Sequence, residues 1–253
     1  MIKNITLTLV ASAGVLIEYN ESRILIDGIF RHDICGLSNI PDQLLNEILK
    51  GQGRYKDIDY LLFSHWHADH FSSELTNEYI RNNRVKHIFL PEVDAHQRKH
   101  LYASEQLYTT LNLPLGSSCT FRLEDEIAVT AFPTIHMGKQ YQSVINYCYL
   151  LALGQKNVLF TADADYVASY YEKTLEGICI DTAFVNPLFF TSKAGRDVLD
   201  KIIKPCNVGI YHIPFKEDDR FGYQRMVKKD IEKYKHAPYE IFVLWDGKET
   251  KII

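Results

Sequence analysis

Four side chains that can bind a metal ion are crowded into one short stretch of this sequence. The run Ser64-His65-Trp66-His67-Ala68-Asp69-His70 follows directly after the apolar segment 58–63. Imidazole and carboxylate groups are ligands of Zn²⁺, Fe and Mn, and packing alone gives no reason to place so many together. If the apolar segment is a strand, His65 and His67 point to one side, because side chains alternate with period two. Asp69 and His70 then face a second point, so the run predicts two metal ions.

A site for two metals needs further ligands, and the sequence offers three, each directly after a strand-like segment. His136 follows the alternating segment 127–132, Asp163 follows 157–161, and His212 follows 208–211. Loops at strand ends commonly carry functional residues because a rigid scaffold holds them. Each of the three alone is typical of an ordinary loop, and their repetition after the first motif favours a shared role.

Taken in order, these residues resemble the metallo-β-lactamase superfamily of metal-dependent hydrolases. The marks are Asp27 at the end of segment 24–27, the run from His65 to His70, then His136, Asp163 and His212. The resemblance covers nearly the whole chain. Within the superfamily the chain most resembles small single-domain relatives, such as ascorbate-6-phosphate lactonase-like enzymes. It implies one metallo-β-lactamase-like domain over residues 1–253. The implied fold is α/β, an αββα sandwich of two mixed β-sheets with helices on the outer faces.

The resemblance also implies a role for each residue. Two sets of ligands follow from it: His65, His67 and His136 for one ion, and Asp69, His70 and His212 for a second, with Asp163 bridging the two. Asp27 corresponds to an outer carboxylate that orients a ligand without binding metal. Asp165 is the alternative bridging residue, although Thr161-Ala162-Asp163 matches the family's small-small-Asp pattern. Zn²⁺ is the favoured cofactor, and Mn²⁺ and Fe²⁺ are alternatives because they bind similar ligand sets.

The chemistry expected of such a site is hydrolysis. Two divalent ions about 3.5–4 Å apart can hold a hydroxide between them and polarise the substrate. They lower the pKa of the bound water to about 7. Asp69, beside that hydroxide, is the expected catalytic residue, which orients it and passes a proton to the leaving group. Relatives that reduce oxygen with iron carry a Glu where this chain has His67, and they need a flavin domain. Hydrolysis is therefore favoured over redox chemistry.

The substrate is less well defined by the sequence. We expect a phosphodiester or a phosphorylated small molecule, with a lactone, ester or amide as the alternative. A non-catalytic metal-binding sensor or partner-binding module is a third possibility. Two groups of side chains are candidates for the mouth of the site: the aromatic residues Trp66, Tyr141, Phe189, Phe190 and Phe215 as an apolar wall, and Lys139, Lys193 and Lys216 as contacts for an anionic substrate.

Composition excludes several other classes of protein. The net charge of −4 gives no basic field that would attract nucleic acid, so a small-molecule partner is expected. Five scattered cysteines without a Cys-x-x-Cys pair fit reduced thiols in a cytoplasmic protein, not a disulfide framework. No apolar run is long enough to span a membrane. A homo-oligomer remains a mild expectation.

Apolar periodicity predicts alternating strands and helices. The segment Ile5-Thr6-Leu7-Thr8-Leu9 alternates like a strand, which favours a strand over a secretory signal at the N-terminus. The predicted helices span 42–49, 73–81, 94–111, 194–203 and 223–234. The predicted strands span 5–9, 13–19, 23–27, 58–63, 85–90, 119–123, 126–132, 143–153, 156–161, 180–185, 207–211, 239–245 and 250–253.

Overall fold

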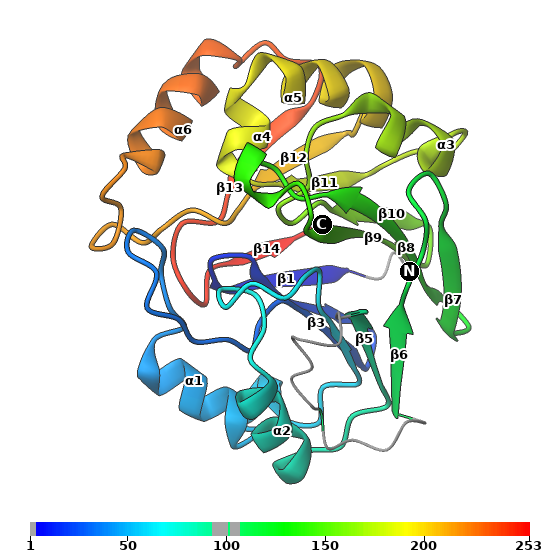
Figure 1. Cartoon of the computed structure of the whole chain (residues 1–253), viewed down its shortest axis with the longest axis vertical. Helices are drawn as coiled ribbons and strands as arrows, with labels where there is room; N and C mark the ends of the chain where they lie inside the picture. Colours follow the sequence, from blue (N-terminus) through cyan, green and yellow to red (C-terminus); the bar gives the residue numbers. More distant parts are fainter. Residues whose placement is uncertain (1–3, 93–100, 102–106) are drawn as a thin grey trace. The chain divides into compact units, whose positions relative to one another are not determined.

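The chain forms two compact units, each built on one β-sheet. The computed structural model describes residues 4–92, 101 and 107–253 (Figure 1). The first unit comprises Met1–Asn112 with Asp246–Ile253, and the second comprises Leu113–Trp245. Each unit holds a mixed seven-stranded sheet and helices. The predicted class, an α/β fold with two mixed sheets, is confirmed, whereas a single domain over 1–253 stays a prediction.

The sheet of the first unit begins as an antiparallel meander and continues with parallel strands. Its order is β14-β1-β2-β3-β4-β5-β6. The strands span Thr250–Ile252 (β14), Ile5–Ala11 (β1), Gly14–Tyr19 (β2), Ser22–Ile26 (β3), Tyr60–Leu62 (β4), His87–Pro91 (β5) and Tyr108–Leu111 (β6). β1 is paired on both sides, with β2 and with β14. The strand predicted at the N-terminus is therefore an integral part of this sheet.

Two helices connect the parallel strands of the first unit. α1 (Asp42–Leu49) lies between β3 and β4, and α2 (Ser73–Asn82) lies between β4 and β5. Because crossovers between adjacent parallel strands are right-handed, both helices lie on the same face of the sheet, and Figure 1 shows them side by side. α1 buries Leu44, Leu45 and Ile48 on one side. The Ser72 side chain caps α2 by accepting a hydrogen bond from the Leu75 N–H.

The sheet of the second unit has the order β13-β12-β11-β10-β9-β8-β7. Its strands span Glu240–Val243 (β13), Asn207–Ile210 (β12), Thr182–Val185 (β11), Lys156–Phe160 (β10), Ile145–Leu153 (β9), Ile127–Ile135 (β8) and Cys119–Glu124 (β7). β10 to β13 are parallel, and β8 runs in the same direction because β9 is antiparallel to both β8 and β10. The carboxyl ends of β8, β10, β11 and β12 therefore meet at one edge of the sheet.

Short helices cover one face of this second sheet. They are α3 (Glu172–Leu175), α4 (Pro187–Thr191), α5 (Lys193–Val198) and α6 (Tyr223–Lys233), and a π-helical turn (Leu199–Ile203) continues α5. Their buried side chains form one apolar cluster with the strands, in which Leu175, Phe189, Leu199 and Val227 from the helical segments pack near Ile210 of β12. This cluster holds the strands whose ends carry the candidate ligands.

The structure adds the short helix α3, which was not predicted, and corrects the predicted elements in three further places. Residues 108–111, predicted as the end of a helix, form strand β6, and residues 93–100 and 102–106 of that prediction lie outside the described residues. α4 was not predicted because a five-residue helix that begins at Pro187 has too few turns to show an apolar period. The predicted helix 194–203 is split into α5 and the π-helical turn.

Among the helices of the described residues, none combines the length and the apolar character that a bilayer span requires.

Two buried tyrosines of the first unit provide a matched test of its packing. The Tyr79 hydroxyl donates to the Tyr55 carbonyl and accepts from the Ile58 N–H, both at 2.8 Å. The Tyr55 hydroxyl is also buried, yet it has no hydrogen-bond partner within the described part of the chain. Tyr79→Phe should therefore lower the free energy of unfolding by about 1–3 kcal/mol, because two buried backbone groups lose their partner. Tyr55→Phe should leave it unchanged or raise it. Urea denaturation followed by circular dichroism measures both, and equal losses in the two variants would contradict this assignment.

Candidate metal centre

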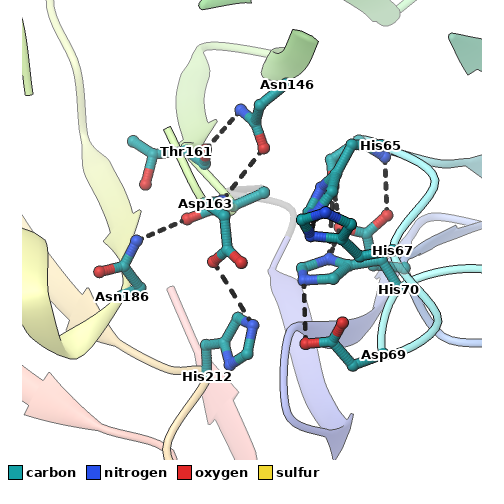
Figure 2. A network of polar contacts seen from close by, with 12 residues as sticks. His65, His67, Asp69, His70, Asn146, Thr161, Asp163, Asn186 and His212 are labelled. Atoms are coloured by element: carbon teal, nitrogen blue, oxygen red, sulfur yellow. Dashed lines mark hydrogen bonds and ion pairs between the residues drawn. The ribbon is translucent and has the colours of Figure 1, made fainter. Parts of the chain in front are cut away.

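The metal-binding run of the first unit lies in the loop that follows β4. β3 and β4 are parallel, so Asp27 at the end of β3 and Ser64 at the end of β4 meet at the same edge of the sheet. Backbone pairing extends this contact, because the Asp27 N–H donates to the Leu62 carbonyl at 2.9 Å. Figure 2 shows the three histidines of the loop gathered together with Asp69. His65, Asp69 and His70 are buried, and His67 is half-buried.

Asp27 is a fully buried carboxylate, and its hydrogen bonds fix the orientation of two histidines. It accepts from the Ser64 N–H at 2.7 Å, from the Ser64 hydroxyl at 2.5 Å and from His70 Nδ1 at 2.8 Å. A buried carboxylate needs such partners because burial removes its hydration. Since the Ser64 proton points to Asp27, the Ser64 oxygen accepts from His65 Nδ1, which lies 2.9 Å away. Both histidines thus carry their proton on Nδ1.

This tautomer turns the Nε2 lone pairs of His65 and His70 toward neighbouring polar side chains. His65 Nε2 lies 3.0 Å from His67 Nδ1, and His70 Nε2 lies 3.6 Å from a carboxylate oxygen of Asp69. A lone pair that faces a carboxylate in a buried place is repelled unless a proton or a metal cation lies between them. The donor set of the first unit, imidazole nitrogens with one carboxylate, therefore fits a divalent metal ion.

The candidate ligands of the second unit lie at the carboxyl ends of β8, β10 and β12. His136 follows β8, Asp163 follows β10, and His212 follows β12. One carboxylate oxygen of Asp163 is 3.2 Å from His136 Nε2, and the other is 3.4 Å from His212 Nε2. His136 Nδ1 is 2.6 Å from the Met137 carbonyl, which can only accept, so the Nε2 of His136 also points a lone pair at a carboxylate. The second unit thus repeats the arrangement of the first.

Asp163 and Asp165 have different surroundings, which separates the two candidates for a bridging carboxylate. The carboxylate of Asp163 lies between His136 and His212. The carboxylate of Asp165 accepts from the Tyr166 N–H at 2.8 Å, which caps the local turn. The geometry therefore favours Asp163 for metal binding and a structural role for Asp165.

Three residues that carry or adjoin candidate ligands adopt the left-handed backbone conformation. Asp27, Ala162 and His212 have φ values of 46°, 48° and 57°. Such a conformation costs a non-glycine residue about 1–3 kcal/mol and persists only where the surroundings enforce it. In each place it bends the chain sharply as it leaves a strand, which brings the following polar side chains back over the edge of the sheet.

Buried polar side chains hold the bend at Ala162 in place. The Ala162 N–H donates to the Tyr211 hydroxyl at 2.9 Å, and its carbonyl accepts from Asn186 Nδ2 at 2.9 Å. The Asp163 N–H donates to Asn146 Oδ1 at 3.1 Å, and Asn146 in turn donates to the Thr161 carbonyl (Figure 2). These hydrogen bonds position Asp163 without contacting its carboxylate.

Sequence reasoning did not identify these supporting residues. Ser64, Asn146, Asn186 and Tyr211 are single polar residues in or beside apolar strands, and their hydrogen bonds join segments far apart in the sequence. A weak signal existed at Asn146, which is a buried amide near the start of the otherwise apolar strand β9.

Tyr223 is a further residue near the second group of ligands. It begins α6, and Asp219 holds the start of that helix by accepting from the Tyr223 and Gln224 N–H groups. Burial raises the pKa of the Tyr223 hydroxyl, and the negative charges of Asp163 and Asp219 raise it further. The phenol therefore lies close enough to Asp163 to feel its charge, and it keeps its proton at neutral pH.

Several side chains expected at the mouth of the site have other roles. Phe189 and Phe190 are fully buried in the apolar cluster of the second unit, because α4 turns them inward, so their place in an apolar wall is wrong. Lys193 forms an ion pair with Asp197 at 3.0 Å along α5. Tyr141 does lie at the site, where its ring contacts His136 edge-on with centroids 4.7 Å apart.

Comparison with known proteins agrees with this geometry. The family model described as "Beta-lactamase superfamily domain" matches residues 22–217. The chain belongs to the beta-lactamase superfamily. No curated protein sequence matches the chain.

Solved structures show the same fold at low sequence identity. The metallo-beta-lactamase fold protein YhfI from Bacillus subtilis has a TM-score of 0.64 and 14% identity, with 100% of each chain covered. Igni18, a metallo hydrolase from the archaeon Ignicoccus hospitalis, has a TM-score of 0.62 and 15% identity, with 99% of this chain and 98% of that chain covered. CmlA, a diiron beta-hydroxylase from Streptomyces venezuelae, has a TM-score of 0.62 and 17% identity. The match covers 100% of this chain and 54% of CmlA, so the chain spans about half of that protein.

Asp27 should control metal affinity although it is not a proposed ligand. Asp27→Asn removes the charge that orients His70 and Ser64, so Zn²⁺ affinity should fall by about 10- to 100-fold. Asp59→Asn is the matched control, because Asp59 also accepts from a backbone N–H, that of Arg23 at 2.8 Å, but at the opposite end of β4. Competition with a chromophoric chelator measures the affinity. An unchanged affinity in Asp27→Asn, or an equal loss in both variants, would contradict the role of Asp27.

Proposed function

We propose that this protein is a metal-dependent hydrolase that uses two divalent metal ions. The observation that carries the proposal is the same in both units: a buried histidine Nε2 lone pair faces a carboxylate, of Asp69 in one unit and of Asp163 in the other. A cation removes this repulsion, and superfamily membership supports that chemistry. In this proposal His65, His67 and His136 would hold one ion, Asp69, His70 and His212 would hold the second, and Asp163 would be a ligand shared by both.

The metal ions would supply Lewis-acid polarisation of the scissile bond and a hydroxide nucleophile near neutral pH. Asp69 orients the attacking water through its second carboxylate oxygen and passes the proton to the leaving group. Asp27 keeps His70 in the Nδ1-protonated tautomer, and the Ser64 hydroxyl does the same for His65. Asn146 and Asn186 keep the bend before Asp163 rigid, so its carboxylate stays between His136 and His212.

The proposed reaction is hydrolysis of a phosphodiester or of a phosphorylated small molecule. The alternative is opening of a lactone, ester or amide, which the same metal chemistry supports. The third alternative is a metal-binding module without turnover. CmlA is a diiron protein with this fold, which supports iron as a candidate metal beside Zn²⁺ and Mn²⁺. The proposed location of the protein is the cytoplasm.

Turnover by the proposed site should depend on His67. His67→Ala should lower hydrolysis of bis-p-nitrophenyl phosphate, or of lactones if these are the substrates, by more than about 100-fold. Changing only the hydrogen-bond partner of a ligand lowers activity by up to about 100-fold, and loss of the ligand itself should lower it further. His236→Ala is the control, since His236 is exposed on the segment before β13.

The result of the two substrate panels separates the three alternatives. Phosphodiester turnover supports the first, and turnover of lactones or esters alone supports the second. Bound metal with no turnover on either panel supports a binding module. Full turnover in His67→Ala would rule out the proposed site.

A further inference from the structure

Exposed apolar side chains surround the ligands of the second unit. Five large hydrophobic residues are exposed at the edge of the sheet where β8, β10, β11 and β12 end, and we call them the apolar rim: Tyr141, Ile145, Val167, Leu188 and Phe221. Phe221 is the most exposed of them, with 68% of its surface accessible. Exposed hydrophobic residues that gather around a functional site indicate a binding surface, whereas scattered ones do not.

Sheet topology places the rim residues at this edge. Ile145 begins β9 and pairs with Ile135, the residue before His136. Val167 follows β10 by a few residues, and Leu188 is in the first turn of α4 after β11. Phe221 lies in the loop between β12 and α6. By contrast, the exposed Ile178 precedes β11 and therefore lies at the opposite edge of the sheet.

One member of the rim contacts a candidate ligand directly, and others lie next to residues that support the ligands. The Tyr141 ring packs edge-on against His136. The Phe221 ring contacts Tyr223, with centroids 6.2 Å apart, and the charge of Asp163 reaches the Tyr223 hydroxyl. Leu188 follows Asn186, whose side chain is hydrogen-bonded to the Ala162 carbonyl. The rim therefore borders the site and is not a separate surface.

The side chains beside the rim carry little net positive charge. The loop 213–222 contains the basic residues Lys216 and Arg220 and the acidic residues Glu217, Asp218 and Asp219, so it is acidic by one charge. Lys139 is the basic residue of the short helical turn Lys139–Tyr141 next to His136. Lys193 is already paired with Asp197. A negatively charged ligand would therefore be attracted by the proposed metal ions and not by these side chains.

We propose that the substrate of this site carries an apolar alkyl or aromatic group that binds the apolar rim. This inference rests on the proposed hydrolase function and narrows its substrates to hydrophobic esters, lactones and phosphodiesters. The apolar group gains binding energy in proportion to the area that leaves water. The reacting bond then lies beside His136, because the Tyr141 ring of the rim contacts this residue.

Binding of simple carboxylates tests the inference without requiring turnover. Acetate, butyrate and octanoate each carry one negative charge and differ only in chain length. Titration calorimetry with the metal-containing protein should show octanoate binding about tenfold or more tightly than butyrate, since each buried CH₂ adds affinity.

Two variants locate the binding surface. Phe221→Ala should weaken octanoate binding by about three- to tenfold through the lost apolar area and leave acetate binding unchanged. Ile178→Ala, which removes an exposed hydrophobic residue at the opposite edge, should have no effect on either. Affinity independent of chain length, or an equal loss in both variants, would overturn the inference.

Two further outcomes are distinguishable. If no substrate is turned over but octanoate binding depends on Phe221, the hydrolase proposal fails and the ligand class stands. If Phe221→Ala instead changes the sedimentation coefficient of the protein and not octanoate affinity, the rim is an interface between copies of the chain, and the inference is wrong.

Discussion

The repulsion between a histidine lone pair and a carboxylate is the constraint on which this site depends. In each unit, hydrogen bonds at Nδ1 force the Nε2 lone pair toward an aspartate oxygen, at 3.6 Å for His70 and Asp69 and at 3.2 Å for His136 and Asp163. Burial prevents water from screening these groups, so a cation is the simple way to make the arrangement favourable. The supporting residues meet the same requirement, because each one fixes the tautomer of a histidine or the direction of a candidate ligand.

The fold provides this constraint by bending the chain at the ends of parallel strands. Left-handed residues follow β3, β10 and β12 directly or within a few residues, where a continued strand would carry the ligands away from the sheet. The cost of each bend is offset by packing elsewhere, notably the apolar cluster under α3 to α6 and the hydrogen bonds of Asn146 and Asn186. The same edge of the second sheet displays the apolar rim, so metal chemistry and proposed substrate binding share one scaffold.

Much of the fold and the clustering of the candidate ligands could be predicted from the sequence, for physical reasons that differ between residues. The run from His65 to His70 is recognisable because four ligands are close in sequence, and most strands show the period of two or an apolar run. Ser64, Asn186 and Tyr211 could not be predicted, since their partners are set by strand pairing. The wrong placement of Phe189 and Phe190 came from α4, whose direction decides which side chains face the core. Residues 108–111 show that a short edge strand is hard to distinguish from the end of a helix.

The most direct test of the central claim is the metal content of the purified protein beside that of its Asp163→Ala variant. Elemental analysis by mass spectrometry after supply of Zn²⁺, Mn²⁺ or Fe²⁺ should give about two divalent ions per chain, as in two-metal hydrolytic sites. The variant should bind fewer, because both remaining histidines of the second unit lose the carboxylate between them. A wild-type protein that binds no metal under any of these conditions, or an Asp163→Ala variant with unchanged content and affinity, would contradict the account.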